Sequence, residues 1–273
     1  MKTPIFANEF TQNSDTMDRA KKFEEFINNC KERHQWCGIG NPFSQILLVG
    51  QELYVPKETK YDLDQILDEN YKYCKDLLGN NDPSIFIKPR GEVKDGKFKN
   101  NTTWCNYQTL IGKVKGANSS VDGMLDFEQF AFTTELSSIP KTSSKFIDSR
   151  ERALVLGRVS ERLKLFKESS FIKDFPVVIL ACGGYIRNQG EGTDRQIDNT
   201  FDVKYGNKDG EPYGKYTNKS KKKWFYTHYS TDPQKYRLVI HTGQVSRYDG
   251  NLWNDMASII SEHLDRLADL GLL

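Results

Sequence analysis

The sequence lacks the features of a membrane or secreted protein. Its longest apolar runs span only a handful of residues, far short of the roughly 20 needed to cross a bilayer. The amino-terminal residues M-K-T-P-I-F-A-N-E-F contain no apolar core of the kind found in signal peptides. These absences predict a cytoplasmic protein that does not bind a membrane.

Cysteine is scarce, and the cysteines present form neither a disulfide framework nor a zinc pattern. The chain has five, an odd number, scattered from Cys30 to Cys182, which predicts reduced thiols. Cys30, His34 and Cys37 lie close in sequence, but the spacing C-x3-H-x2-C matches no standard zinc pattern and no second cysteine pair completes it. We therefore expect no metal and no cofactor.

A strong charge of either sign is missing as well. The formal net charge is +2, so the whole-chain charge neither favours nor excludes a nucleic-acid partner. What the chain does contain is enough apolar material for a core, because 37% of its 273 residues are hydrophobic and 28% are charged. No internal repeat or long linker divides it. We expect a monomer with a single domain, residues 1–273, carrying polar insertions near 79–101 and 188–234.

Four short apolar runs predict β-strands. Residues 46–49 and 177–181 are unbroken apolar runs, typical of central parallel strands that are covered on both faces. Residues 130–132 and 237–240 predict two further strands. Amphipathic helices separate the strands, which favours parallel pairing. The predicted fold is an α/β protein, a three-layer α/β/α sandwich around a four-stranded parallel sheet. The predicted helices span residues 14–34, 63–78, 147–167 and 252–270, with a further helix beginning at Thr102 or Thr103.

Residues suited to binding or chemistry follow each predicted strand. They are Gln51 and Glu52 after the first strand, Thr133 after the second, Gly183 after the third and His241 after the fourth. Parallel strands place their carboxyl ends on one edge of the sheet, where open α/β folds bind ligands. These residues are therefore expected to line one cleft. The plainer interpretation of each is a strand that runs into a polar loop.

The motifs after the first and last strands resemble those of the uracil-DNA glycosylase superfamily. Its best-known members carry G-Q-D-P-Y after the first strand, and this chain has G-Q-E-L-Y at residues 50–54. They carry H-P-S-P-L-S after the last strand, followed by a turn and a helix, and this chain has H-T-G-Q-V-S at residues 241–246. The resemblance covers roughly residues 46–260 and implies the family's four parallel strands flanked by helices.

The resemblance implies catalytic and pocket roles for individual residues. Glu52 takes the place of the aspartate that orients water and stabilises the cationic sugar. His241 takes the place of the histidine that hydrogen-bonds the departing base. Gln51, Tyr54 and Thr133 would line the base pocket, with Tyr54 guarding it against the thymine methyl group. Thr133 stands where uracil-excising members have an asparagine, so uracil is not expected to be the preferred base.

A nucleic-acid contact surface is also implied. Val245 falls at the apolar wedge that replaces the flipped base, and Ser246 at a phosphate-contacting serine. Independently of the resemblance, basic residues beside Trp224 and the aromatic residues after it suit phosphate contact and base stacking, although such a run is also typical of a solvated loop. The candidate phosphate donors are Lys221, Lys222, Lys223 and Arg247.

Two classes of function remain open from the sequence. The first is a hydrolase, a DNA glycosylase that flips a damaged or modified base from the duplex and cleaves its N-glycosidic bond. The second is a non-catalytic module that uses the same pocket to bind a nucleic acid or a nucleotide. The expected partner is DNA or another nucleic acid, a free nucleotide remains open for the second class, and the presence of turnover distinguishes the two classes.

Overall fold

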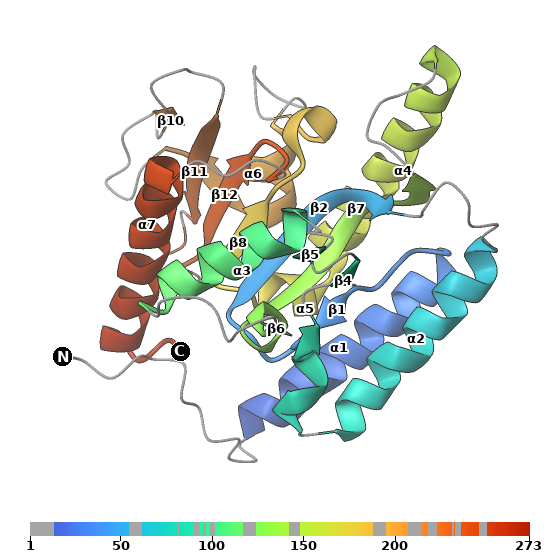
Figure 1. Cartoon of the computed structure of the whole chain (residues 1–273), viewed down its shortest axis with the longest axis horizontal. Helices are drawn as coiled ribbons and strands as arrows, with labels where there is room; N and C mark the ends of the chain where they lie inside the picture. Colours follow the sequence, from blue (N-terminus) through green and yellow to red (C-terminus); the bar gives the residue numbers. More distant parts are fainter. Residues whose placement is uncertain are drawn as a thin grey trace.

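The chain folds as an α/β protein in which helices flank one mixed β-sheet (Figure 1). In the described part of the chain, no helix has both the length and the apolar character needed to span a bilayer. The structure is a computed structural model. It describes residues 14–54, 62–80, 82–89, 93–94, 97–98, 102–116, 124–141, 148–187, 195–206, 215–217, 223–230, 232, 236–245 and 250–273.

The helices lie close to where the sequence predicts them, and two begin at a capping aspartate. The Asp62 carboxylate accepts the backbone N–H of Asp64 at 3.0 Å, and the Asp148 carboxylate accepts that of Glu151 at 2.8 Å. The bounds of the five predicted helices are confirmed to within a few residues, and the structure adds two short helices, α5 and α6. The helices are α1 (Ser14–Glu32), α2 (Leu63–Gly79), α3 (Thr102–Val114), α4 (Ser149–Glu168), α5 (Ser170–Lys173), α6 (Gln196–Phe201) and α7 (Gly250–Asp269).

Eight of the described strands form the main sheet. They are β1 (Ile39–Gly40), β2 (Ile46–Tyr54), β7 (Ala131–Lys141), β8 (Val177–Leu180), β9 (Val203–Tyr205), β10 (Lys215–Thr217), β11 (Trp224–Ser230) and β12 (Leu238–Thr242). Seven follow the order β1-β7-β2-β8-β12-β11-β10, and β9 pairs with β11. The neighbours β7, β2, β8 and β12 are mutually parallel and are called the parallel block. Chain order reverses at β2, which is where open α/β sheets bind ligands.

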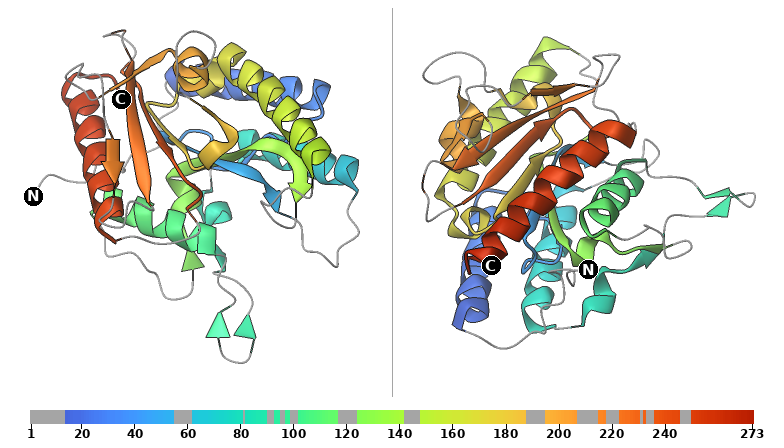
Figure 2. Two further views of the ribbon diagram at one scale, coloured as in Figure 1. Left: turned by 90° about the horizontal axis from the view of Figure 1, so that it is seen from above. Right: turned by 90° about the vertical axis from the view of Figure 1, so that its left-hand side faces the viewer.

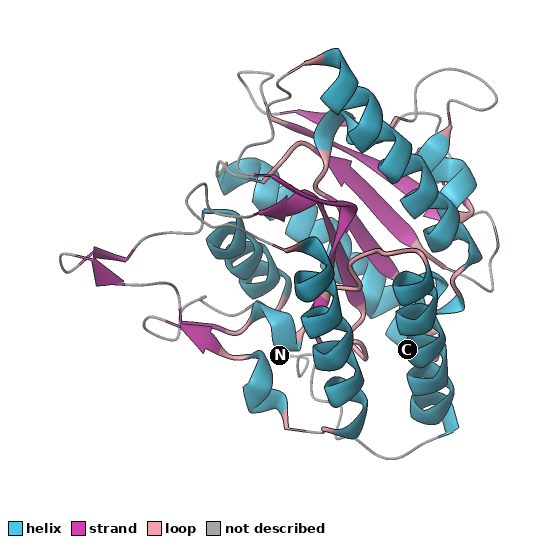
Figure 3. Ribbon diagram, turned by 90° about the vertical axis from the view of Figure 1, so that its right-hand side faces the viewer, coloured by secondary structure: helices cyan, strands magenta, loops and turns pink. Residues whose placement is uncertain are grey.

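Two small ribbons lie outside the main sheet. In one, β3 (Lys88–Pro89) pairs with β6 (Met124–Leu125), and in the other β4 (Val93–Lys94) pairs with β5 (Lys97–Phe98). The β4–β5 hairpin stands away from the body of the fold (Figures 2 and 3). Single 3-10 turns are η1 (Pro83–Phe86), η2 (Phe127–Gln129) and η3 (Gly183–Tyr185).

Helices cover both faces of the parallel block because its strands are apolar on both sides. Leu47, Val49 and Phe132 point into a cluster shared with α1, α2, α4, α5 and α6. Ile46 and Leu48 point the other way, into a cluster shared with α3 and α7. Figure 2 shows α7 beside α3 on this second face. Burial on both faces explains why these strands are unbroken apolar runs in the sequence.

The predicted four-stranded parallel sheet is wrong in size and partly in direction. All four predicted strands are present and form the parallel block, but antiparallel strands extend the sheet on both sides. Residues 188–234, predicted as a polar insertion, supply α6, β9, β10 and β11. Only one face of β11 is packed into an apolar cluster, through Phe225, so the strand lacks the continuous apolar run of a central strand.

Two strands also run further than predicted. β2 continues past Val49 to Tyr54, and β7 extends to Lys141, because the two strands keep pairing with each other beyond β8. Their extensions are largely polar, so apolar runs alone do not locate the strand ends. Gln51, Glu52 and Thr133 therefore lie within strands rather than after them, and His241 lies within β12.

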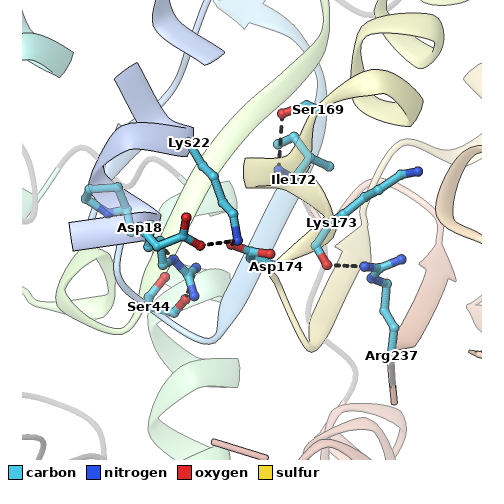
Figure 4. A network of polar contacts seen from close by, with 10 residues as sticks. Asp18, Lys22, Ser44, Ser169, Ile172, Lys173, Asp174 and Arg237 are labelled. Atoms are coloured by element: carbon cyan, nitrogen blue, oxygen red, sulfur yellow. Dashed lines mark hydrogen bonds and ion pairs between the residues drawn. The ribbon is translucent and has the colours of Figure 1, made fainter. Parts of the chain in front are cut away.

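A polar network ties helices to the amino ends of the strands (Figure 4). The Lys22 ammonium group bonds Asp174 at 2.9 Å and Asp18 at 2.6 Å, which joins α1 to the segment before β8. Arg237, directly before β12, donates to the backbone carbonyls of Lys173 and Phe201. These contacts occupy the amino edge of the sheet, and the predicted site residues lie towards the opposite edge.

Candidate active site at the carboxyl edge of the sheet

One turn, residues 182–185, connects the candidate site residues of neighbouring strands. Gln51 on β2 donates its side-chain N–H to the carbonyl of Cys182 at 3.1 Å. Gly183 adopts a positive φ of 55°, and a Cβ added there would lie 3.4 Å from Gln51 Nε2. The turn therefore follows β8 sharply and packs against the side chain of Gln51.

His241 meets the same turn from β12. Its Nε2 lies 2.8 Å from the carbonyl oxygen of Gly183. Because a carbonyl only accepts, Nε2 must carry the proton, and Nδ1 of the neutral ring is then unprotonated. Burial lowers the pKa of His241 to about 4, an effect only partly opposed by the bond to Gly183. The imidazole is therefore a neutral hydrogen-bond donor at neutral pH.

Glu52 reaches the turn through Tyr185. The nearby Tyr185 hydroxyl and Lys141 ammonium group both lower the pKa of Glu52, but burial is the larger effect and raises this pKa overall. Lys141 itself lies 3.4 Å from Glu151 on α4. Among the described residues, none provides a hydrogen-bond partner for the buried Oε2 atom of Glu52. A carboxylate oxygen is thus held within the fold without a donor.

Thr133 lies deeper in the sheet than the resemblance implies. It pairs with Leu48 on one side and Ile39 on the other, and only 4% of the residue is exposed. Glu135 lies two residues further along β7, on the same face as Thr133, and pairs with Gly50 of β2 near the carboxyl edge of the sheet. Sequence reasoning missed Glu135 because it placed the strand end at Phe132; a longer strand with alternating faces would have pointed to it. We call Gln51, Glu52, Glu135, Tyr185 and His241 the edge site.

An aromatic row borders the edge site on the side of β11. Trp224 lies edge-on to His241 with ring centroids 5.0 Å apart, and Tyr226 lies 6.2 Å from the same ring. Tyr205 continues the row from Tyr226 at 5.7 Å. These rings are partly exposed, so they form an aromatic wall of the kind on which a planar base can stack.

The predicted nucleic-acid contacts are only partly within the described residues. Val245 is buried, with 3% exposure, in the cluster beneath α3 and α7, and its carbonyl accepts the Asn106 amide. In this conformation its side chain packs in the core and does not project as a wedge. Lys223 precedes β11 directly. The positions outside the described residues are Lys221, Lys222, Ser246, Arg247 and the side chain of Tyr54.

The residues Cys30, His34 and Cys37 do not converge. Both cysteines are fully buried, whereas 73% of the His34 side chain is exposed. Burial raises the pKa of both thiols well above the ordinary value, so they remain protonated. Within the described ranges, no group of three or more His, Cys, Asp or Glu side chains is placed to hold a metal ion.

The burial of His241 predicts a pH dependence of stability. An unfolded histidine has a pKa of about 6.5, whereas burial lowers that of folded His241 to about 4. Between these values only the unfolded state binds the proton, so stability is lost as the pH falls through this window. We expect His241→Gln to remove up to about 3 kcal/mol of this acid-induced loss.

Urea unfolding at neutral pH and at about pH 4.5 measures this effect. His34→Asn is the matched control, because His34 is exposed and has a positive φ of 50°, which asparagine tolerates. The control should leave the acid-induced loss unchanged. If His241→Gln behaves like the control, the histidine is not held neutral by burial.

A comparison with protein-family models finds none that matches the chain, and a search among curated proteins finds no significant relative.

Proposed function

We propose that the chain is a DNA glycosylase, a hydrolase that cleaves the N-glycosidic bond of a damaged or modified base. The observation that carries the proposal is the meeting of Gln51, Glu52 and His241 at the turn of residues 182–185. These are the residues for which the motif resemblance implies base binding, sugar stabilisation and contact with the departing base. They come from two separate strands and contact one short turn.

The fold supports a relationship with the uracil-DNA glycosylase superfamily. The parallel block, with α3 and α7 on one face and the remaining helices on the other, fits a three-layer α/β/α sandwich. The family's four parallel strands correspond to β2, β7, β8 and β12 in chain order. In this proposal the antiparallel strands β1, β9, β10 and β11 are additions at the edges of the sheet.

Each side chain of the site has a separate role in bond cleavage. The glycosidic bond breaks through a sugar that carries positive charge, and ionised Glu52 stabilises that charge and orients the attacking water. His241, neutral because of its burial, donates a hydrogen bond from Nε2 to the departing base once the base replaces the Gly183 carbonyl as acceptor. Gln51 holds the turn against β2 and lines the base pocket. The aromatic wall of Trp224 and Tyr226 offers a stacking surface for the extruded base.

The chemical character of the edge site favours this function over a nucleotide-binding module. A phosphate site presents cations or backbone N–H groups to its ligand. The edge site instead presents the Glu52 carboxylate, whose ionised form suits a cationic sugar. Phosphate contacts on DNA would then come from outside the edge site, where Lys223 and the predicted donors Lys221, Lys222 and Arg247 remain the candidates.

Single-turnover cleavage tests the proposal directly. Oligonucleotides carrying uracil, hypoxanthine, oxidised or alkylated bases are incubated with excess protein, and alkaline scission then reveals abasic product. We expect release of at least one modified base and little release of uracil, because Thr133 is buried within β7 and cannot replace a base-reading asparagine. If uracil were released faster than the other bases, the expected discrimination against uracil would be wrong. No product from any substrate, with DNA still bound, would favour the binding module.

A further inference from the structure

A second carboxyl group lies beside Glu52 and has no role in the function proposed so far. Glu135 on β7 pairs in register with Gly50 on β2, and Glu52 follows two residues later on β2. A Cβ added to Gly50 would lie 2.1 Å from Oε2 of Glu135 and 2.8 Å from its Oε1. The Glu135 carboxyl group therefore occupies the space above Gly50, which only glycine leaves open.

The surroundings of Glu135 favour its protonated form. The ionisable groups that act on it are Glu52 from β2, Tyr107 from α3, Cys182 after β8 and the Arg162 guanidinium from α4. Burial and the charge of Glu52 raise the pKa of Glu135 well above the ordinary value, and the opposing effect of Arg162 is smaller than either. Among the described residues, none offers a hydrogen-bond partner to its buried Oε2 atom.

The two carboxyl groups thus have different environments. Near Glu52 lie the Tyr185 hydroxyl and the Lys141 ammonium group, and both favour its ionised form. For Glu135, burial and the neighbouring charge of Glu52 both favour the protonated form. When the environments of two neighbouring carboxyl groups shift their pKa values apart, one group acts as the acid and the other as the ionised partner.

We propose that Glu135 is the general acid that protonates the departing base, so that the edge site acts on purine-class bases that must gain a proton to leave. This inference rests on the proposed glycosylase function and names its substrate class. Hypoxanthine is the simplest such base, because it is a neutral purine whose imidazole ring accepts the proton on leaving. Uracil differs because it departs as an anion, which a hydrogen bond from neutral His241 would suffice to stabilise.

The reaction balances with water as the only other reactant. The C1′–N bond breaks and its electron pair goes to the base, which takes the proton from the Glu135 carboxyl group. Water, oriented by ionised Glu52, then adds to C1′ and forms the new C–O bond. The proton released from water returns to the carboxylates and restores Glu135. The products are the free base and an abasic sugar, with the protein unchanged.

Single-turnover release of hypoxanthine and of 7-methylguanine from DNA tests the proposal. The second base already carries a positive charge, so it leaves without a proton donor. We expect Glu135→Gln to slow hypoxanthine release by about 10²-fold or more and to abolish the decline of the rate at alkaline pH. Release of 7-methylguanine, where the wild type shows it, should change less than about threefold.

Gly50→Ala provides a second variant that keeps the acid but displaces it. The added methyl group must push the flexible Glu135 carboxyl aside, so hypoxanthine release should fall although Glu135 is present. Gly157→Ala is the matched control, because a Cβ there meets nothing within 4 Å, and alanine favours the helix. It should leave the rate unchanged.

The outcomes separate this inference from the proposed function. Efficient uracil release without hypoxanthine release would leave the glycosylase function standing and overturn the purine class. Unchanged hypoxanthine release in Glu135→Gln, or equal losses for both purines, would overturn the role of Glu135 alone. A wild-type protein that releases no base would overturn both proposals. Selective loss of hypoxanthine release, together with loss of the alkaline decline, supports the inference.

Discussion

Glu52→Gln is expected to reduce single-turnover base release by about 10³-fold while leaving DNA affinity unchanged. Glutamine keeps nearly the same shape but carries no charge, so it cannot stabilise the cationic sugar. The effect is expected to be large because the Glu52 carboxylate is partly buried, where a charge acts more strongly than in water. Alkaline scission of abasic product measures the rate, and fluorescence anisotropy of a labelled oligonucleotide measures binding.

The pH profile of the wild-type rate gives the same prediction a second readout. Burial raises the pKa of Glu52 above its ordinary value, and the proposed mechanism requires its ionised form. The rate should therefore fall on the acidic side at a pH above the roughly 4.3 of an ordinary glutamate. Glu161→Gln, on the exposed face of α4, is the matched control and should change neither rate nor profile. Turnover that survives in Glu52→Gln would remove Glu52 from the mechanism.

The sequence was sufficient to locate the parallel block because its strands are buried on both faces. Residues 46–49 and 177–180 contact helices on either side, so every position must be apolar, and an unbroken apolar run results. The helices were equally predictable, because each packs one apolar stripe against the sheet. The α/β class and the central, buried position of β2 and β8 follow from these local patterns.

The antiparallel strands and the polar strand extensions could not be located in the same way. β11 alternates partly exposed aromatic residues with Phe225 and Thr227, and basic and glycine-rich sequence surrounds it, so the local pattern predicts a polar insertion. The extension of β2 is held by pairing with β7, which is a long-range contact that no local pattern reveals. That pairing also decides that Glu135, rather than Thr133, joins the edge site.

The edge site itself was half predictable. Gln51, Glu52 and His241 were expected at the carboxyl edge from their positions after apolar runs, and the structure brings all three to one turn. Tyr185 was not expected, because nothing in the sequence shows that the turn after β8 returns towards β2. The opposition of Glu135 to Gly50 depends on register, which sequence periodicity does not supply.

Arg162→Met is expected to lower the free energy of unfolding by about 3–5 kcal/mol. Arg162 on α4 is only 1% exposed. Its guanidinium donates to Thr134 Oγ1 at 2.6 Å and to Gln35 Oε1 at 3.2 Å, and its Nε donates to the Glu135 carbonyl at 3.1 Å. Methionine fills much of the volume of the arginine side chain but leaves the buried acceptors without donors. These unsatisfied acceptors account for the expected loss of stability.

Arg158→Met, one turn earlier on α4, is the matched control for Arg162→Met. Arg158 pairs with Glu161 at 2.9 Å on the surface, where 45% of its side chain is exposed. Such a pair contributes less than about 1 kcal/mol, so urea unfolding should separate the two variants clearly. If both variants unfold alike, the buried network does not stabilise the fold.

Because Arg162 also holds the backbone of Glu135, Arg162→Met should slow hypoxanthine release even where the variant remains folded. That coupling would show that the core beneath β7 positions the second carboxyl group of the edge site.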